Sequence, residues 1–327
     1  MLKCLNKISG VILTVLALRI FIKGCHISWK KLLAPNLGLG IDLTNQGRWA
    51  VITGATDGLG KAFAKALASK GLDIVLISRS LIKLKNVETE IKERYGVKTR
   101  IVVADLTEGQ EAYSKIAKAT EELEVGILIN NAGMNFDYPE LFIEMPEEIL
   151  NKILQLNTVA LTVITRIILP KMLVRKKGVI INISSITGMD IDIPYLTAYA
   201  ATKAYIIKFT NNLAAEIAQD GITVQCIVPG PVATKMIKIK KSTWIIPSAD
   251  KFVEATLKTV GIESLTTGYL PHYLLYAYIK MLCVYEKGFM RLTTKIMLKH
   301  KKRFLRKMIK EQEQMKDMTQ RDNLFIE

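Results

Sequence analysis

Residues 53–60 read TGATDGLG and follow a short apolar run, AVIT at 50–53. Glycine occupies positions 54, 58 and 60, which gives the spacing G-x-x-x-G-x-G. Glycines allow a tight turn and let the backbone come close to a group bound at the start of the following helix. The apolar positions after the turn have helical spacing, and Gly71 supplies a stop; they are Leu59, Phe63, Ala66 and Leu67. The stretch therefore predicts a strand, a glycine-rich turn and a helix.

The same alternation of apolar runs and helical patterns continues along the chain. Runs rich in Val and Ile lie at 50–53, 73–78, 99–104, 126–130, 178–184 and 222–228. Short continuous apolar runs are typical of strands that are buried on both faces of a parallel sheet. Half of the 327 residues are hydrophobic, so a large core is available. We expect one doubly wound α/β domain of the Rossmann type over residues 46–268.

A dinucleotide is the ligand that suits a glycine-rich turn between such a strand and helix. Its pyrophosphate would lie on the helix N-terminus, close to the backbone of the turn. The candidate residues are Gly54, Asp57, Gly58, Leu59 and Gly60. The spacing differs from the usual G-x-G-x-x-G, and an ordinary glycine-rich turn is the alternative.

The end of the second predicted strand indicates which dinucleotide is bound. An NAD-binding fold usually offers Asp or Glu to the adenosine ribose at this point. Here the chain reads Ser78-Arg79 and has no carboxylate. A guanidinium can form charge-assisted hydrogen bonds to a 2′-phosphate. The pattern favours NADP(H), unless Arg79 is only a solvated loop residue.

Tyr199 and Lys203 form a candidate acid–base pair in the segment YAATK. Four positions apart on a predicted helix, they share one face. A phenol has a reference pKa near 10, and a nearby ammonium favours the phenolate, so we expect Lys203 to lower the pKa of Tyr199. Ser184 and Ser185 end the preceding strand, where a hydroxyl can bind a substrate carbonyl. A Tyr/Lys pair alone is often just a pair of solvent-exposed residues on a helix, so the prediction depends on the other motifs.

The histidines and cysteines exclude several other chemistries. No zinc-binding His spacing and no C-x-x-C pair occurs among His26, His272, His300, Cys4, Cys25, Cys226 and Cys283. A metal site, a Ser-His-Asp triad and a disulfide framework are therefore not expected. Widely spaced cysteines favour a reducing compartment.

The net charge of +16 is concentrated in the two flanks of the chain. Residues 1–50 carry +6 and residues 280–327 carry +7, whereas residues 51–279 carry only +3. A nucleic-acid-binding domain usually carries its basic residues on the fold itself. The distribution favours a membrane-facing surface and predicts no nucleic-acid partner.

The N-terminal flank, residues 1–45, is predicted to be a membrane anchor and linker. Its apolar run, ISGVILTVLALRIFI at 8–22, has 15 residues, fewer than the roughly 20 of an ordinary membrane-spanning helix. A short or tilted anchor, an interfacial helix and a signal peptide compete as interpretations, and a simple buried helix is a further alternative.

The C-terminal flank, residues 269–327, is predicted to be an apolar and then basic extension. Residues 269–289 are apolar and rich in tyrosine, as interfacial segments often are. Residues 292–309 place apolar side chains at multiples of four among Lys and Arg. This pattern predicts a basic amphipathic helix that could lie on an anionic membrane, and a solvated helix packed on the domain is the alternative.

Together the motifs resemble the short-chain dehydrogenase/reductase family. They occur in the family's order over about residues 48–235. The matching pieces are TGATDGLG at 53–60, Asp105, NNAG at 130–133, Asn157, Ser185, YAATK at 199–203 and PGPVAT at 229–234. The resemblance implies a Rossmann-type fold and an NADP-dependent oxidoreductase that interconverts a ketone and an alcohol.

The resemblance also implies roles for individual residues. Tyr199 would be the general acid in carbonyl reduction, and Lys203 would lower its pKa and bind the nicotinamide ribose. Ser185 would orient the substrate carbonyl, and Asn157 would hold a water in a proton relay to Lys203. Ser185 and Tyr199 lie fourteen positions apart, one more than the family usually shows, so Ser184 is an alternative.

Further residues are implied to line the cofactor. Asp105 and Asn131 would contact the adenosine half, with Gly133 nearby in the NNAG motif. Val232 and Thr234 would contact the nicotinamide amide.

A subgroup is indicated by VLISRS, PVATKM and the late TTGYLPH. These pieces resemble membrane-bound very-long-chain 3-oxoacyl-CoA reductases and their 17β-hydroxysteroid dehydrogenase relatives. The resemblance implies an acyl-CoA or steroid ketone as substrate and an endoplasmic reticulum membrane location with the catalytic domain facing the cytosol. A homodimer is a further expectation, and a catalytically weak dinucleotide-binding scaffold is the alternative of another class. Asp190 and Asp192 are unexpected beside so apolar a substrate.

Overall fold

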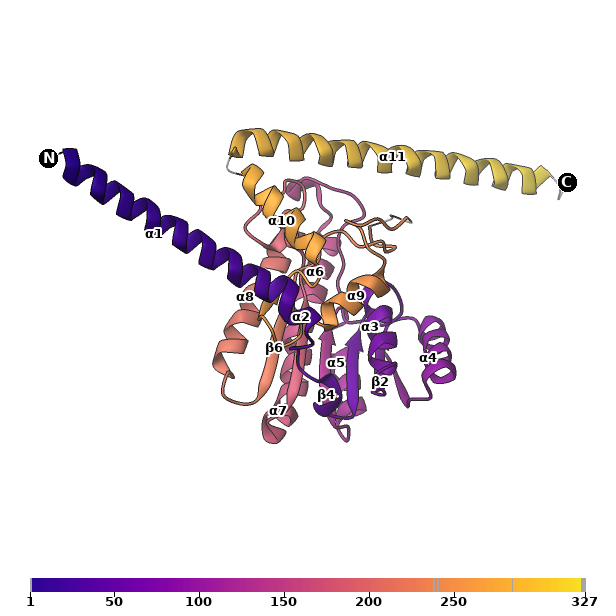
Figure 1. Cartoon of the computed structure of the whole chain (residues 1–327). Coiled ribbons are helices and arrows are strands. Elements are labelled where there is room, and N and C mark those ends of the chain that lie inside the picture. Colours follow the sequence, from indigo (N-terminus) through magenta and orange to yellow (C-terminus); the bar gives the residue numbers. More distant parts are fainter. Residues whose placement is uncertain (1, 238, 240, 284, 325–327) are drawn as a thin grey trace.

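The centre of the molecule is a parallel sheet with helices on both faces (Figure 1). The structure is a computed structural model, and it describes residues 2–237, 239, 241–283 and 285–324. Within these residues the sheet has seven strands in the order β3-β2-β1-β4-β5-β6-β7. The strands are β1 (Trp49–Thr53), β2 (Asp73–Ser78), β3 (Thr99–Val103), β4 (Val125–Asn130), β5 (Gly178–Ile183), β6 (Ile222–Ile227) and β7 (Leu265–Thr266). The predicted Rossmann-type sheet is confirmed, and sequence periodicity missed only β7, which has two residues.

Helices cover the sheet because successive strand residues alternate between two apolar cores. In β1, Ala50 and Ile52 join one core, whereas Val51 joins the other. The helices of the domain are α3 (Gly58–Ala68), α4 (Leu81–Tyr95), α5 (Gln110–Thr120), α6 (Glu147–Leu154), α7 (Ala160–Arg175), α8 (Thr197–Glu216) and α9 (Ala249–Leu257). Short turns complete it: 3₁₀ segments Leu43–Asn45, Phe142–Glu144 and Ile186–Gly188, and a π-helical segment, η4 (Gln155–Val159).

The strand order places the loops after β1, β4 and β5 side by side. The chain passes from β1 outward to β2 and β3, and then returns to β4 on the other side of β1. In open parallel sheets, ligands bind at such a reversal, outside the carboxyl ends of the strands. The predicted cofactor and catalytic motifs follow these strands, so the topology brings them to one crevice.

The two flanks are helical and extend beyond the sheet domain (Figure 1). The N-terminal flank contains α1 (Leu2–Ser28), a π-helical segment (Trp29–Leu33) and α2 (Ala34–Asn36). The C-terminal flank contains α10 (Leu270–Cys283) and the long α11 (Glu286–Leu324), which is longer than the predicted 292–309 helix. The predicted boundaries at residues 45 and 268 stay predictions.

Among the residues that could be searched for a membrane span, one helical stretch is long and apolar enough, at Glu147–Arg175. It runs from α6 through α7 and packs against the sheet, with Ile153, Ile164 and Met172 buried. Burial against the sheet therefore explains why this helical stretch is apolar.

Candidate active site

The glycine-rich turn is built as its sequence predicts. Gly54 and Gly58 adopt positive φ angles of +65° and +51°, which residues with a side chain rarely adopt. A Cβ on Gly60 would collide with the carbonyl of Gly54, so this position also requires glycine. Asp57 caps α3 by accepting a 2.8 Å hydrogen bond from the Gly58 N–H. The turn thus presents backbone N–H groups at the start of α3, next to the end of β1.

Asn131 fastens the loop after β4 to this turn. Its side-chain amide donates to the carbonyls of Thr53 and Gly54, at 3.0 and 3.3 Å. The Thr53 hydroxyl accepts hydrogen bonds of 3.0 Å from the backbone N–H groups of Asn131 and Ala132. The predicted cofactor residues 53–60 and 130–133 therefore form one rigid unit.

Arg79 stands at the end of β2, beside the turn. Its side chain is 78% exposed, and Nη1 lies 3.9 Å from a carboxylate oxygen of Asp105, at the end of β3. Asp105 is held by the backbone N–H and the hydroxyl of Thr107, at 3.0 and 2.8 Å. The hydroxyls of Ser78 and Thr56 are 3.1 Å apart. The predicted adenosine-side residues are together, and the guanidinium has room to reach a 2′-phosphate.

Tyr199 and Lys203 lie one turn apart on α8 and face the end of β5. The Lys203 ammonium is 5.5 Å from the centroid of the Tyr199 ring. Lys203 is only 4% exposed, and its Nζ donates a 3.1 Å hydrogen bond to the carbonyl of Ile183. The Ser185 side chain is close enough to the Tyr199 hydroxyl to lower its pKa through hydrogen bonding. The structure therefore brings together the three residues predicted from separate motifs.

The ionisation of this pair differs from the sequence-based expectation. Burial raises the pKa of Tyr199 to about 12, and the hydrogen bond from Ser185 opposes the shift only in part. Burial also lowers the pKa of Lys203 to about 8, because desolvation disfavours its charged form. The expected lowering of the Tyr199 pKa by Lys203 is therefore wrong: desolvation sets the direction of the shift, and the opposing contribution comes from Ser185. The Tyr199 phenol is therefore protonated at neutral pH and can donate its proton.

Ser184 and Ser185 have different surroundings. The Ser184 hydroxyl is buried and donates a 2.7 Å hydrogen bond to the backbone carbonyl of Lys203. Ser185 caps a short 3₁₀ turn, where its hydroxyl accepts from the N–H and the hydroxyl of Thr187, at 3.2 and 3.0 Å. Of the two serines, Ser185 is the one that affects the Tyr199 hydroxyl, and its role in orienting a substrate carbonyl stays a prediction.

Asn157 lies in the π-helical segment η4, between α6 and α7. Its side chain accepts from Met134 N, and donates to Met134 O at 2.9 Å and to the Thr202 hydroxyl at 3.0 Å. A Cβ on Gly133 would lie 3.3 Å from both the Asn157 side-chain oxygen and the Lys203 ammonium. Single π-helical turns are frequent at functional sites. Here the π-helical turn places Asn157 in contact with Met134, in the loop after β4. The absence of a Cβ on Gly133 leaves a narrow space between Asn157 and Lys203.

Val232 and Thr234 follow β6 and approach the same crevice. Val232 is buried, and the Thr234 methyl would lie 3.4 Å from a Cβ on Gly58, so Thr234 lies over the glycine-rich turn. The adjacent Lys235 pairs with the carboxylate of Asp57 at 2.6 Å. The loop after β6 therefore closes the crevice from the side opposite to Arg79.

Sequence reasoning missed the contacts that join the C-terminal flank to this side of the domain. Asp190, in the loop after β5, accepts hydrogen bonds from Tyr276 and Lys280 on α10. These contacts lower the pKa of Asp190, first through Lys280 and then through Tyr276. The unexpected charge of Asp190 in this loop is therefore a link to α10. A negative charge flanked by apolar sequence was the available signal, but it did not reveal the partner.

A second link joins α11 to the loop after β4. Lys301 lies 2.5 Å from the buried carboxylate of Glu140 and 3.1 Å from Glu144. The rings of Tyr138 and Phe304 are 4.9 Å apart. Consistent with these contacts, α11 runs across the top of the domain in Figure 1. The C-terminal flank thus packs against the loop after β4, which begins with the NNAG motif.

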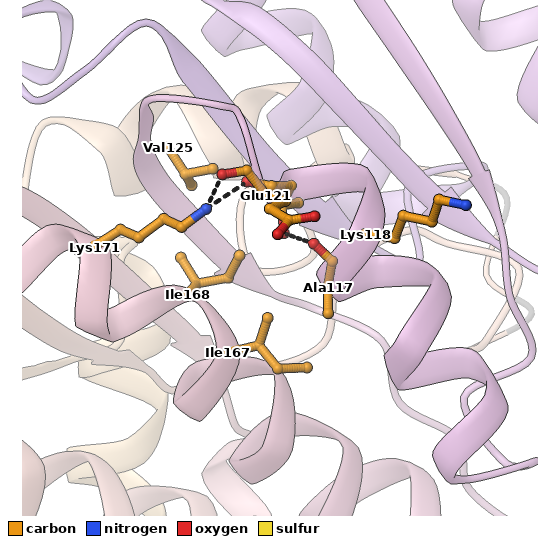
Figure 2. A pocket seen from close by; sticks show the side chains of 8 residues that line it. Ala117, Lys118, Glu121, Val125, Ile167, Ile168 and Lys171 are labelled. Carbon is orange, nitrogen blue, oxygen red and sulfur yellow. Dashed lines mark hydrogen bonds between the residues drawn. The ribbon is translucent and has the colours of Figure 1, made fainter.

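A separate hollow of about 330 Å³ lies between α5 and α7. Lys171 donates hydrogen bonds to the backbone carbonyls of Thr120 and Glu121. Figure 2 shows Lys171 beside Glu121, with Ile167 and Ile168 also lining the hollow. It contains none of the predicted catalytic or cofactor residues. Within the described residues, no group of three or more His, Cys, Asp or Glu side chains could hold a metal ion.

The sheet order, the glycine-rich turn and the Ser185–Tyr199–Lys203 set define a dehydrogenase site. The family model described as short chain dehydrogenase matches residues 48–243, and the chain belongs to this family.

The chain is similar to very-long-chain 3-oxoacyl-CoA reductases. It is 47% identical to the one from Anas platyrhynchos over 228 residues, which cover 69% of this chain and 73% of the relative. It is 44% identical to the one from Homo sapiens over 231 residues, covering 70% and 73%. A solved short-chain dehydrogenase from Sphingobium yanoikuyae in complex with NADPH has a TM-score of 0.62 and 27% identity, and the match covers 74% of this chain and 95% of that one.

Proposed function

We propose that this chain reduces a 3-oxoacyl-CoA with a long acyl chain to the 3-hydroxyacyl-CoA, with NADPH as reductant, as a step of fatty-acid elongation. The observation that carries the proposal is the set of Ser185, Tyr199 and Lys203 at the end of β5, in a chain 44% to 47% identical to reductases named for this substrate. A catalytically weak scaffold would not need a buried lysine beside the tyrosine.

The residues around the crevice fit NADPH. Gly54, Gly58 and Gly60 lack a Cβ, which lets the backbone of the turn and the start of α3 come close to the pyrophosphate. Arg79 would pair with the 2′-phosphate, and Asp105 would bound the adenosine side. The missing Cβ of Gly133 keeps the space next to Lys203 open to a ribose hydroxyl.

Bound NADPH would supply a hydride to the carbonyl carbon of the substrate. The Ser185 hydroxyl would hold the carbonyl oxygen, and Tyr199 would donate its proton to that oxygen as negative charge develops. The raised pKa of Tyr199, about 12, keeps this proton in place at neutral pH before the substrate binds. The Lys203 ammonium would bind the ribose and stabilise the phenolate that remains after proton transfer.

Asn157 would support the return of a proton to Tyr199. Its side chain is already engaged with Met134 and Thr202, so a water on the relay would be held by backbone groups of η4 rather than by the Asn157 amide. The role of Asn157 is then to fix the π-helical turn beside Lys203.

Attachment to the endoplasmic reticulum membrane, with the domain in the cytosol, is the second part of the proposal. Helix α1 has 27 residues, about 40 Å at 1.5 Å per residue, and projects away from the domain in Figure 1. Ile20 and Phe21 on it are 73% and 68% exposed. An apolar helix that no protein covers is stable in a lipid environment. The basic α11 would add salt-sensitive binding to anionic lipid, and a homodimer remains a prediction from the family.

An oxidation assay with the purified full-length chain tests the reaction. NADPH consumption is measured with a long-chain 3-oxoacyl-CoA and, in parallel, with a steroid 17-ketone. The proposal predicts turnover of the acyl-CoA with kcat/KM at least about tenfold higher than that of the steroid. A preference for the steroid would contradict the proposed substrate, and no NADPH consumption with either would favour a scaffold.

A further inference from the structure

His272 is a buried titratable residue outside the predicted catalytic set. It lies in the first turn of α10 and has no exposed surface, whereas His26 and His300 are exposed. The rings of Phe252 and Tyr269 pack against it, with centroids at 5.4 and 5.2 Å. A polar ring buried this completely needs hydrogen-bond partners for both nitrogens.

The partners of His272 are three backbone groups of one loop. The N–H of Gly230 donates a 3.1 Å hydrogen bond to Nδ1. Nε2 lies 3.1 Å from two carbonyl oxygens, those of Pro231 and Ile245. Because Nδ1 accepts and Nε2 faces only acceptors, these contacts require the neutral ring with its proton on Nε2. Burial also lowers the pKa of His272, which favours the neutral form.

The loop that His272 holds is the one that closes the cofactor crevice. Gly230 and Pro231 immediately precede Val232, and Ile245 lies farther along the same loop. A Cβ on Gly230 would come within 2.9 Å of the imidazole carbon Cδ2, so the ring packs directly on the peptide. His272 therefore fastens both ends of the segment 230–245 to α10.

The same segment is also tied to the catalytic serine. The N–H of Ile186, the residue after Ser185, donates a 3.0 Å hydrogen bond to the carbonyl of Pro229. A shift of residues 229–231 would therefore displace Val232 and Thr234 on one side and Ser185, at the end of β5, on the other.

We propose that His272 is a positioning residue, which holds residues 230–234 in the conformation that binds the nicotinamide half of NADPH. This inference rests on the proposed use of NADPH, but not on the identity of the ketone. It assigns to the start of the C-terminal flank a direct part in cofactor binding, through Val232 and Thr234.

The experiment compares His272→Phe, which keeps an aromatic ring but loses all three hydrogen bonds, with His272→Gln, which retains an acceptor and a donor. NADPH affinity is measured by titration of the full-length protein without substrate, and KM for NADPH and kcat are measured with 3-oxoacyl-CoA. We expect His272→Phe to weaken NADPH binding about tenfold. KM should rise in parallel and kcat at saturating NADPH should change less than about threefold, with His272→Gln recovering most of the affinity.

A second variant tests the contact from the other side if His272→Phe does not fold. Gly230→Ala places a methyl group against the ring and should also weaken NADPH binding several-fold. Leu274→Ala is the matched control, because it removes an exposed side chain from the same helix α10 and should leave the affinity unchanged.

NADPH affinities within a factor of two of the unmodified chain in folded His272→Phe and Gly230→Ala would overturn the inference, even if thermal stability falls. Failure of the unmodified chain to bind NADPH would instead refute the proposed cofactor. Failure to reduce the ketone with NADPH binding intact would refute only the proposed substrate.

Discussion

The proposed cofactor side and the proposed substrate side of the crevice are held together in different ways. On the cofactor side, short motifs meet through the backbone of the turn, as in the positive φ of Gly54 and the hydrogen bonds from the Asn131 side chain to two backbone carbonyls. On the substrate side, side-chain contacts join loops to the C-terminal helices, as in Glu140–Lys301 and Asp190–Lys280. The first arrangement depends on glycines and strand ends, and the second on individual charged side chains. Changes on the two sides should therefore affect different steps.

The largest effect is expected at the centre, where the two sides meet. Tyr199→Phe removes the proposed proton donor but keeps the ring, so the fold and NADPH binding should survive. General acid catalysis typically contributes 10²–10⁴-fold, and kcat should fall by about that factor. Stopped-flow or steady-state assays of NADPH oxidation measure it. Retention of more than about a tenth of the normal turnover would remove Tyr199 from the mechanism.

Arg79 tests the cofactor side alone. Loss of a charge-assisted hydrogen bond costs about 1.5–3 kcal/mol, which is about a 10- to 150-fold loss of affinity. Arg79→Ala should therefore weaken NADPH binding by this factor and leave NADH binding nearly unchanged. Lys92→Ala, on the exposed face of α4, is the matched control. It also removes one positive charge, and it should change neither the NADPH affinity nor the NADH affinity. An equal loss for NADH and NADPH in titrations would contradict the assignment of Arg79 to the 2′-phosphate.

The pH dependence should follow Lys203 rather than Tyr199. The pKa of Lys203 is lowered to about 8, so its ammonium is present below that pH and lost above it. The pKa of Tyr199 is raised to about 12, so the phenol stays protonated over the whole range from pH 7 to 10. Reductive kcat/KM should therefore decline by up to about tenfold per pH unit above pH 8. A profile that is flat from pH 7 to 10 would contradict this ionisation of Lys203.

The smallest effect is expected from the exposed link on the substrate side. Lys280→Gln removes a partner of Asp190, and both side chains are more than half exposed, so the pair is worth about 0–1 kcal/mol. KM for the acyl-CoA should rise only about two- to threefold, whereas NADPH affinity should not change. Lys258→Gln, which breaks an exposed pair with Glu254 at the end of α9, is the control. A larger effect on NADPH affinity than on the KM for acyl-CoA would contradict the claim that this pair affects substrate binding rather than cofactor binding.

The same contrast explains what sequence could predict. The glycine-rich turn and the six longer strands were predicted, because each has a local pattern and parallel topology brings strand ends together. The partners of Asp190 and Glu140 lie 90 and 161 residues away in segments without a motif, so no local pattern reveals them. The pKa values of Tyr199 and Lys203 were also missed, because desolvation depends on packing around the pair rather than on its spacing.

Transfer of label from NADPH to carbon 3 of the acyl chain tests the central claim most directly. The full-length chain and Tyr199→Phe are incubated with a long-chain 3-oxoacyl-CoA and NADPH carrying deuterium at the transferable position, and the products are analysed by mass spectrometry. The account predicts a 3-hydroxyacyl-CoA with one deuterium on carbon 3 from the unmodified chain, formed at least about 10²-fold more slowly by Tyr199→Phe. A product without deuterium on carbon 3, or equal rates from the two proteins, would contradict it.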